Sequence, residues 1–400
     1  MLLIFLYFLV STGYLLIFAF AGRVVQNPLF QNSRSRRNGL VLIPAFREDR
    51  IILNTAFAAS SQTFNSGTFR VIVIADQMQA ETIQRLEAAN VTVIEVKFET
   101  SSKGRSLNAV LPHINARTDD FIFVLDADNI PGRACLDSIN DALDTGYKVV
   151  QLHRTAKNTE TPVALLDAIS EEINLNIFRR GAFNLGLSAA PMGSGMAFDI
   201  GVFQDIFSDP ETIASASEDR YVENYLIRHN MRLGYLDDAL VFDEKVSNTA
   251  VLKKQRIRWM EAQLGQLRRF ANESGTFGPS NRQYYHSFFQ TLLLPRVFYL
   301  ALSGIICLLL IAEGLWNPGW LYPASYFWLI LVLLYWTVLG VSIPGKFYTF
   351  RTLKAVFSLP IVILTMLMAL FQLKKTRKEF LHTSKSFVAK DQEQKPEQHL

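Results

Sequence analysis

The chain contains 400 residues, 50% of them hydrophobic, with a mean hydropathy of +0.16 and a formal net charge of +4. The length exceeds that of one ordinary domain, and so apolar a composition is unusual for a soluble enzyme. We therefore expect membrane segments beside a catalytic domain, whereas the small net charge gives no electrostatic support for a nucleic-acid partner.

The first expected element is a transmembrane anchor over residues 1–22. This run carries no charged side chain, and at about 1.5 Å per residue it can cross a hydrocarbon core of roughly 30 Å. A cleaved signal peptide is the alternative, weakened because no basic residue precedes the run and because the run is long. Arg34, Arg36 and Arg37 follow it, which predicts a cytoplasmic central region.

Residues 38–275 have the pattern of one α/β domain, because short β-branched runs alternate with helical patterns, as in a mostly parallel sheet. Strands are expected at residues 40–44, 70–75, 91–96, 121–125 and 148–152. Helices are expected at residues 106–111, 134–145, 219–228 and 251–269. Cys135 and Cys307 are the two cysteines, and their separation argues against a disulfide or a zinc site.

Two carboxylates, Asp126 and Asp128, end a strand-like apolar run. Side chains at positions i and i+2 project on one side of an extended chain, and two acids so placed repel each other unless a cation lies between them. Mg²⁺ or Mn²⁺ bound with a diphosphate would be such a cation. An ordinary acidic turn after a strand is the alternative.

Other polar residues also follow expected strands or begin expected helices. Asp76 ends a buried strand, where it could bind a ligand or cap a turn. Glu48 could hydrogen-bond a ribose or base, or cap the next helix. Lys103 opens a helix and could bind an anion there, or belong to a solvated basic turn.

A glycine-containing segment, residues 193–196, could let the backbone pass close to a ligand, or it could form a tight turn. Glu218 and Asp219 open a helix further along the chain. Acids are favoured there by the helix dipole alone, so a catalytic role and a purely structural role both remain open.

One helical segment presents Gln255, Arg258 and Trp259 at positions i, i+3 and i+4, so the three share a face. Arginine binds phosphate oxygens in a fork, and tryptophan offers a flat apolar surface to a sugar ring. This face therefore suits a diphosphate next to a sugar. An amphipathic helix on the membrane surface is the alternative.

Residues 287–373 are expected to form an interfacial helix and C-terminal membrane segments. Apolar stretches cover residues 297–312, 319–344 and 355–373. Four full crossings would place the basic C-terminal tail outside, against the positive-inside pattern, so the last stretch is expected to lie in the interface or to re-enter. Residues 386–400 turn polar and are expected to be disordered.

Taken in order, Asp76, Asp126-Ala127-Asp128, the Gly-Ser-Gly-Met segment, Glu218-Asp219 and Gln-x-x-Arg-Trp resemble the membrane-integrated family 2 glycosyltransferases. Cellulose, hyaluronan, chitin and poly-N-acetylglucosamine synthases are similar over residues 38–275. The resemblance implies a GT-A-type, Rossmann-like mixed sheet flanked by N-terminal and C-terminal transmembrane helices. It also implies a bacterial inner-membrane protein with a cytoplasmic catalytic domain.

The same resemblance implies a role for each residue of the set. The expected nucleotide and donor site consists of Ala45, Glu48, Asp76, Lys103, Asp126, Gln255 and Arg258. Asp128 is expected to bind Mg²⁺ or Mn²⁺, and Trp259 and Gly195 to contact the acceptor. Asp219 is the expected catalytic base, beside Glu218.

The implied reaction is the inverting transfer of a sugar, with UDP as the expected carrier, to a polysaccharide or lipid-linked acceptor through a β-glycosidic bond. Single addition to a lipid is the alternative to polymerisation: the small membrane part favours single addition, whereas Gln-x-x-Arg-Trp favours polymerisation. A membrane nucleotidyltransferase and a catalytically inactive scaffold are the other readings.

Overall fold

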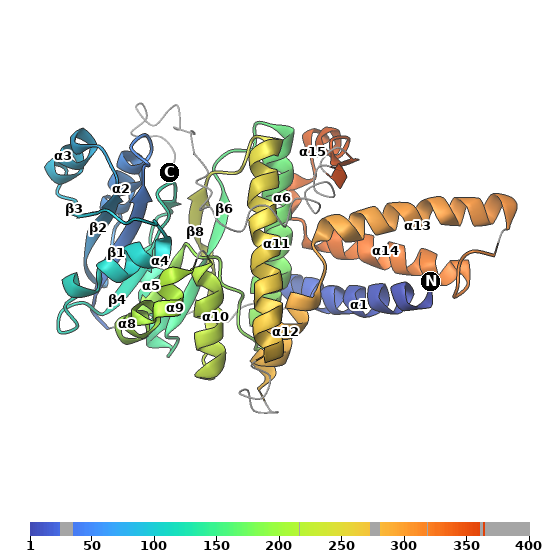
Figure 1. The fold of residues 1–400 in the computed structure, drawn as a ribbon, viewed down its shortest axis with the longest axis horizontal. Helices are drawn as coiled ribbons and strands as arrows, with labels where there is room; N and C mark the ends of the chain where they lie inside the picture. The colour runs from blue at the N-terminus through green and yellow to red at the C-terminus, as the bar shows by residue number, and fades with distance from the viewer. Residues whose placement is uncertain (25–34, 216, 273–280, 318, 361–362, 365–400) are drawn as a thin grey trace.

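The computed structural model describes residues 1–24, 35–215, 217–272, 281–317, 319–360 and 363–364. It contains an α/β body from which three long apolar helices extend to one side (Figure 1). The body is built on an eight-stranded sheet with the order β3-β2-β1-β4-β7-β6-β8-β5.

The strands confirm every strand position expected from the sequence and add others. Their bounds are β1 Arg37–Phe46, β2 Gly67–Asp76, β3 Thr92–Val96, β4 Phe121–Val124, β5 Ile130–Pro131, β6 Val149–Ala156, β7 Met196–Asp199 and β8 Leu233–Asp243. β1 pairs in parallel with β2 and β4, and β2 with β3. β7 is antiparallel to both β4 and β6, so the sheet is mixed, as the GT-A expectation requires.

The mostly parallel sheet expected from strand and helix alternation is confirmed, with β7 antiparallel to β4 and β6, and β5 antiparallel to β8. The expected strands did not include β7 or β8. β7 has only four residues, too few to show an alternating pattern. β8 carries Asp237 and Asp238 in its middle, and its pairing with β6 shifts register between Leu152 and His153. Acidic residues and a bulge in the middle of a strand interrupt the alternation of apolar and polar residues from which strands are predicted.

The helices of the body include the four expected at residues 106–111, 134–145, 219–228 and 251–269, each within three residues of the expected bounds, and others that were not predicted. Their bounds are α2 Ile52–Ser60, α3 Ala80–Ala88, α4 Lys103–Ala109, α5 Cys135–Asp144, α6 Pro162–Leu175, α7 Ala182–Asn184, α8 Ile200–Ser208, α9 Pro210–Ala214, α10 Glu218–Arg228 and α11 Thr249–Asn272. α4 starts earlier than expected because Ser102 caps it, accepting the backbone N–H of Arg105.

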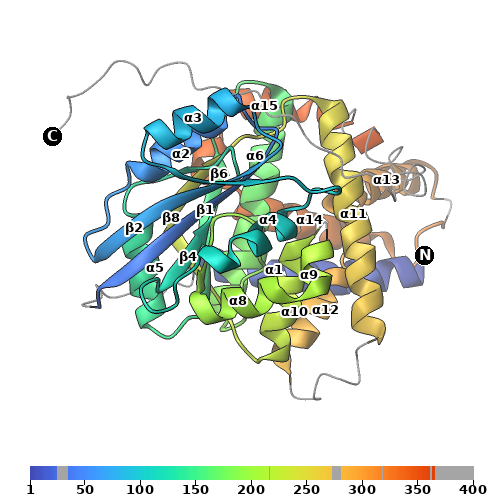
Figure 2. The same ribbon diagram turned by 60° about the vertical axis from the view of Figure 1, so that its left-hand side comes forward.

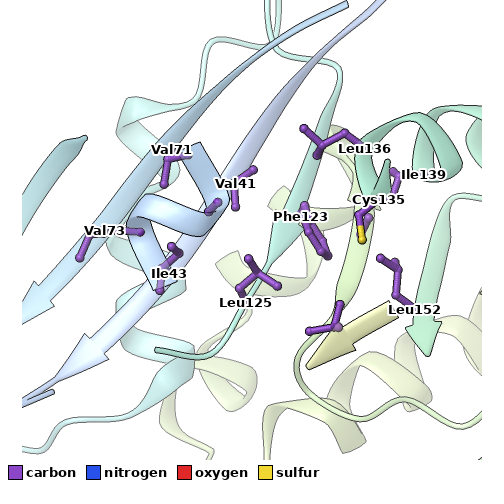
Figure 3. Packing of buried hydrophobic residues seen from close by; sticks show 14 of the residues in the cluster. Val41, Ile43, Val71, Val73, Phe123, Leu125, Cys135, Leu136, Ile139 and Leu152 are labelled. Atoms are coloured by element: carbon purple, nitrogen blue, oxygen red, sulfur yellow. The ribbon is translucent and has the colours of Figure 1, made fainter. Parts of the chain in front are cut away.

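Both faces of the sheet are apolar and covered, which explains why the central strands are continuous hydrophobic runs. On one face, β-strand side chains pack with α5 (Figure 3), as shown by Val41, Ile43, Phe123, Leu136 and Ile139. On the other face, alternate residues of the same strands, among them Leu40, Leu42 and Ile122, pack on α4, α8 and α10. This three-layer packing fixes the strand ends that carry the polar residues.

The apolar helices are α1 Leu2–Val24, α13 Arg296–Trp316 and α14 Ser325–Ser342, and by length and composition each can cross a membrane. They match the anchor and the first two C-terminal stretches, although α14 is shorter than the stretch 319–344. α12 Arg282–Leu292 precedes α13, and α15 Phe350–Val356 follows α14. Most of the stretch 355–373, and the whole tail 386–400, lie outside the described residues.

A six-residue π-helix, Asn176–Gly181, joins the apolar helices to the body. Asn176 donates from Nδ2 to the carbonyl of Ala19 over 3.0 Å, and Asn184 donates to the carbonyl of Ala21 over 2.8 Å. At Gly181, a Cβ atom would lie 2.2 Å from the carbonyl oxygen of Phe18. The backbones of α1 and the π-helix therefore touch directly.

Candidate active site

The carboxyl ends of β1 and β2 carry the first group of predicted residues. Ala45 pairs in register with Ala75, and Phe46 with Asp76. Asp76 is fully buried, and within the described part of the chain neither of its carboxylate oxygens has a hydrogen-bond partner. Glu48, half-buried, follows the end of β1. Because a buried carboxylate without a partner is costly, Asp76 fits a ligand that donates hydrogen bonds.

The turns that flank Asp76 are conformationally unusual. Arg47 and Gln77 both have a positive φ of 54°, a region that residues other than glycine rarely adopt. The Nε of Arg47 donates to Oε1 of Gln77 over 3.2 Å, which links the two strand ends. Strained backbone of this kind is concentrated at ligand sites.

The two acids after β4 lie at the same edge of the sheet. Asp126 accepts a hydrogen bond from the ammonium group of Lys103. Asp128 is 1% exposed; its Oδ1 accepts from Asn129 over 3.2 Å, and its Oδ2 accepts from the backbone N–H of Glu244 over 3.1 Å. These contacts fix the orientation of the Asp128 carboxylate.

The residues of this edge suit a divalent metal that is shared with a substrate. Among the described residues, no three His, Cys, Asp or Glu side chains are grouped as metal ligands. Mg²⁺ is commonly held by one or two carboxylates, substrate phosphates and water, without an all-protein cage. Asp128, with Asp126 beside it, matches that ligand set.

Lys103 connects the acids after β4 to the start of α10. Besides Asp126, its Nζ donates to the carbonyl of Gly193 over 2.9 Å and lies 3.9 Å from Oε1 of Glu218. The structure thus brings Lys103, Asp126, Gly193 and Glu218 into one cluster. The segments involved are neighbours at one edge of the body, where α4, α9 and α10 lie side by side (Figure 2).

The Gly-Ser-Gly segment forms the wall of this cluster. Gly193 has a φ of +81°, and a Cβ atom there would lie 3.3 Å from Oε1 of Glu218. Gly195 has a φ of +63°, and a Cβ atom there would lie 3.5 Å from Cγ of Arg154. The positive φ of both residues favours glycine. At Gly193 a Cβ atom would also crowd Glu218, whereas the distance at Gly195 is an ordinary van der Waals contact.

Glu218 and Asp219 occupy the first turn of α10. Burial raises the pKa of Glu218 to about 7; the positive charge of Lys103 opposes this shift and the negative charge of Asp219 adds to it. Oδ1 of Asp219 accepts from the backbone N–H of Arg220 over 3.0 Å. A carboxyl group with a pKa near 7 is suited to proton transfer at physiological pH.

The residues expected on one face of α11 are Gln255, Arg258 and Trp259. The Oε1 of Gln255 is buried, and no described residue hydrogen-bonds it. Arg258 is half-buried, whereas Trp259 is 42% exposed. Hydrogen bonds between Gln266 and Asn224, the shorter 2.7 Å long, tie α11 to α10.

Arg256, which sequence reading did not use, lies against Trp259. Its guanidinium carbon is 4.3 Å from the centroid of the indole ring, and its Nη2 is 2.6 Å from Oδ1 of Asp167 on α6. The arginine therefore covers one side of the tryptophan and ties it to α6. The sequence shows Arg256 close to Trp259, but it does not show the ion pair with Asp167, which lies 89 positions away along the chain.

A second group missed in the sequence is a network of buried charges between β6, β8 and α6. Arg154 pairs with Asp243 and lies 3.6 Å from Glu171, and Lys245 lies 2.7 Å from Glu171. A charged residue in the apolar run of β6 was the signal that could have revealed it, because unpaired charges are not buried.

The protein comparisons agree with this architecture. The family model described as "Glycosyltransferase like family 2" matches residues 37–262. No curated protein matches the chain in sequence. A mannosyltransferase from Pyrobaculum calidifontis, solved with GDP-Man and Mn²⁺, is 14% identical with a TM-score of 0.53; the match covers 92% of this chain and 97% of that one.

Two further solved structures are more distant. TarS of S. aureus, residues 1–349, is 13% identical with a TM-score of 0.44, covering 85% of this chain and 92% of that one. Glucosyl-3-phosphoglycerate synthase from Mycobacterium tuberculosis, solved with Mn²⁺ and UDP, is 16% identical with a TM-score of 0.38, covering 52% of this chain and 73% of that one.

The resemblance to polymer synthases in particular stays a prediction. The match over residues 37–262 places the chain in glycosyltransferase-like family 2, and the protein is a glycosyltransferase with a GT-A-like fold.

Proposed function

We propose that this enzyme transfers a sugar from a nucleotide-sugar donor to a glycan or lipid-linked acceptor at a membrane, with inversion at the anomeric carbon. One observation carries the proposal: a single lysine, Lys103, contacts both Asp126 at the donor edge of the sheet and the segment facing Glu218. Donor binding and proton transfer can therefore take place within one cluster.

In this mechanism Asp219 takes the proton from an acceptor hydroxyl. The hydroxyl oxygen then attacks the anomeric carbon from the side opposite the nucleoside diphosphate, which leaves. An α-linked donor would give a β-glycosidic product. Lys103 and Arg258 offset negative charge on the leaving diphosphate.

The donor site combines Asp76, Glu48 and Ala45 for the nucleoside with Asp126, Gln255 and Arg258 for the diphosphate. Asp128 would hold Mg²⁺ or Mn²⁺, which supplies Lewis-acid stabilisation of the diphosphate. Uridine is the base that the synthase resemblance suggests, whereas the mannosyltransferase from Pyrobaculum calidifontis was solved with GDP-Man. Trp259 and Gly195 would contact the acceptor.

The membrane location rests on the three apolar helices and on the charges at their ends. Basic residues lie where these helices meet the body: Arg23 at the end of α1, Arg296 at the start of α13 and Lys346 after α14. By the positive-inside pattern these charges favour a catalytic body on the cytoplasmic side, at the inner membrane if the cell is bacterial. An acceptor embedded in the bilayer would then lie close to α11 and α12.

The main alternative is the addition of one sugar to a lipid. It is favoured by the described part of the chain having three helices long enough to cross a membrane, a small number for a channel that passes a polymer. The nucleotidyltransferase reading is set aside by the family assignment.

The test is a donor screen on purified protein in detergent. Each sugar nucleotide is incubated with membrane lipid extract and Mn²⁺, and the release of nucleoside diphosphate is recorded. One donor should be hydrolysed or transferred well above the others, and sizing of the labelled product separates polymer from single addition. Asp219→Asn should lower turnover by about 10² to 10⁴ while nucleotide binding persists. Near wild-type turnover in this variant would remove the base assignment, and no release with any donor would indicate a scaffold.

A further inference from the structure

The side chain of Arg154, on β6, reaches two loops of the candidate site at once. It is only 15% exposed, and it forms an ion pair with Asp243 at the end of β8. Its Nη1 donates to one loop and its Nη2 to the other. Arginine is suited to this because its planar guanidinium presents donors in fixed directions.

The first loop is the Gly-Ser-Gly wall. Nη1 of Arg154 donates to the carbonyl of Met192 and to Oγ of Ser194, both over 3.2 Å. Gln151, also on β6, holds the same loop: its Nε2 donates to the carbonyl of Ser194 over 2.9 Å, and its Oε1 accepts from the N–H of Met192 over 2.9 Å. The position of Gly193 against Lys103 and Glu218 thus depends on β6.

The second loop follows β8 and supports the metal-binding acid. Nη2 of Arg154 pairs with Asp243, and the next residue, Glu244, donates its backbone N–H to Oδ2 of Asp128 over 3.1 Å. Lys245, the next residue, forms an ion pair with Glu171 over 2.7 Å. The orientation of Asp128 is therefore coupled to the ion pair that Arg154 makes.

Arg154 contributes one of the positive charges in this network. Arg154 and Lys245 face Asp243 and Glu171 in a largely buried space. Burial opposes the charge of Arg154, but Asp243, Glu171 and Asp126 raise its pKa above the ordinary value. Removing the guanidinium would take one positive charge away from Asp243, Glu171 and Asp126.

We infer that Arg154 is a positioning residue: it fixes the wall at Gly193 relative to the carboxylate of Asp128, so that donor, metal and catalytic base meet at fixed distances. The inference rests on the proposed function. It concerns a side chain that acts through Ser194 and Asp243 and not through contact with substrate. A misplacement of about 1 Å at such a site costs on the order of 10² in rate.

The experiment compares Arg154→Met and Arg154→Lys with Arg180→Met. Arg180 is a matched control because it also makes a buried pair with an aspartate, its Nε lying 2.7 Å from Oδ2 of Asp237, outside the substrate cluster. Melting temperature, kcat and donor KM are measured for all variants. In addition, Mn²⁺ is titrated calorimetrically with UDP present, which does not require turnover.

Both Arg154 variants should lower kcat by about 10² and weaken Mn²⁺ binding by about tenfold or more, as loss of an outer-sphere partner does. Lysine should rescue little, because one ammonium group cannot span both loops. Arg180→Met should lower the melting temperature while kcat and Mn²⁺ affinity stay near wild type. If the Arg154 variants change only the melting temperature, as the control does, the inference is overturned. A wild-type protein that neither turns over nor binds Mn²⁺ would instead reject the proposed function.

Two milder variants keep the test decisive if Arg154→Met fails to fold. Ser194→Ala removes an acceptor in the first loop only, and should lower kcat with unchanged Mn²⁺ affinity. Asp243→Asn removes the charge in the second loop, and should weaken Mn²⁺ binding. Wild-type values for both variants would show that neither loop depends on Arg154.

Discussion

The Nζ of Lys103 lies 3.9 Å from Oε1 of Glu218, while the same nitrogen donates hydrogen bonds to Asp126 and to the carbonyl of Gly193. One cation therefore stands between an acid at the donor edge of the sheet and an acid at the start of α10. Because both carboxylates are partly withdrawn from water, their repulsion is weakly screened and the lysine has a large effect on each.

Lys103→Met should lower kcat/KM by about 10² to 10³, the scale for losing one preorganised charge stabiliser. Without the ammonium group, Asp126 and the diphosphate repel each other, and donor binding weakens as well. Lys103→Arg should recover part of the loss. The matched control is Lys148→Met, which breaks an exposed pair with Asp199 at 2.8 Å and should leave kinetics unchanged. Equal kinetics in the two methionine variants would contradict the assigned role.

The pKa of Glu218, raised by burial to about 7, predicts the pH dependence of the reaction. Below pH 7 the carboxyl is mainly protonated, and as the pH rises through 7 it ionises beside Asp219. We expect kcat to rise between about pH 6 and 8, with an apparent pKa that belongs to the pair. In Glu218→Gln this step should vanish, because an amide has no proton to lose near pH 7. A pH–rate profile measured on both proteins decides this, and a flat wild-type profile would reject it.

The stacking of Arg256 on Trp259 predicts an effect on the acceptor and not on the donor. Arg256→Leu removes the cation from the ring and the tie to Asp167. The loss should be about 1 kcal/mol, or roughly fivefold in acceptor KM. If Arg256 acts through the indole, the double variant Arg256→Leu, Trp259→Leu should be no worse than Trp259→Leu alone. Additive effects, or a change confined to donor KM, would show that the arginine acts elsewhere.

His153 predicts how stability depends on pH. Burial tends to lower its pKa, but Asp237 and Glu172, at 3.2 Å and 3.4 Å, raise it to about 9. Because the folded-state pKa exceeds the unfolded value near 6.5, the stabilisation is complete below pH 6.5 and is lost as the pH rises through 9. The melting temperature in detergent should fall over that window and depend less on pH in His153→Gln. Parallel curves for the two proteins would assign the effect to other groups.

The local features of this protein could be read from its sequence. The apolar runs that became α1, α13 and α14, the strand that ends in Asp76, the strand that precedes Asp126 and the helix that begins at Glu218 all appear as short-range patterns. Such patterns are visible because hydrophobic periodicity and charge reflect burial along a single element. The order of the acids and the Gln-x-x-Arg-Trp segment also indicated the family to which residues 37–262 belong.

Only the tertiary structure decided which of these residues meet. The antiparallel insertion of β7 brings Gly193 beside Lys103, and the bulged pairing of β6 with β8 brings Arg154 to Asp243. Both contacts join positions about 90 residues apart. Whether distant charges meet depends on strand order and register, which are set by packing of the whole core, and no single segment of the chain records that outcome.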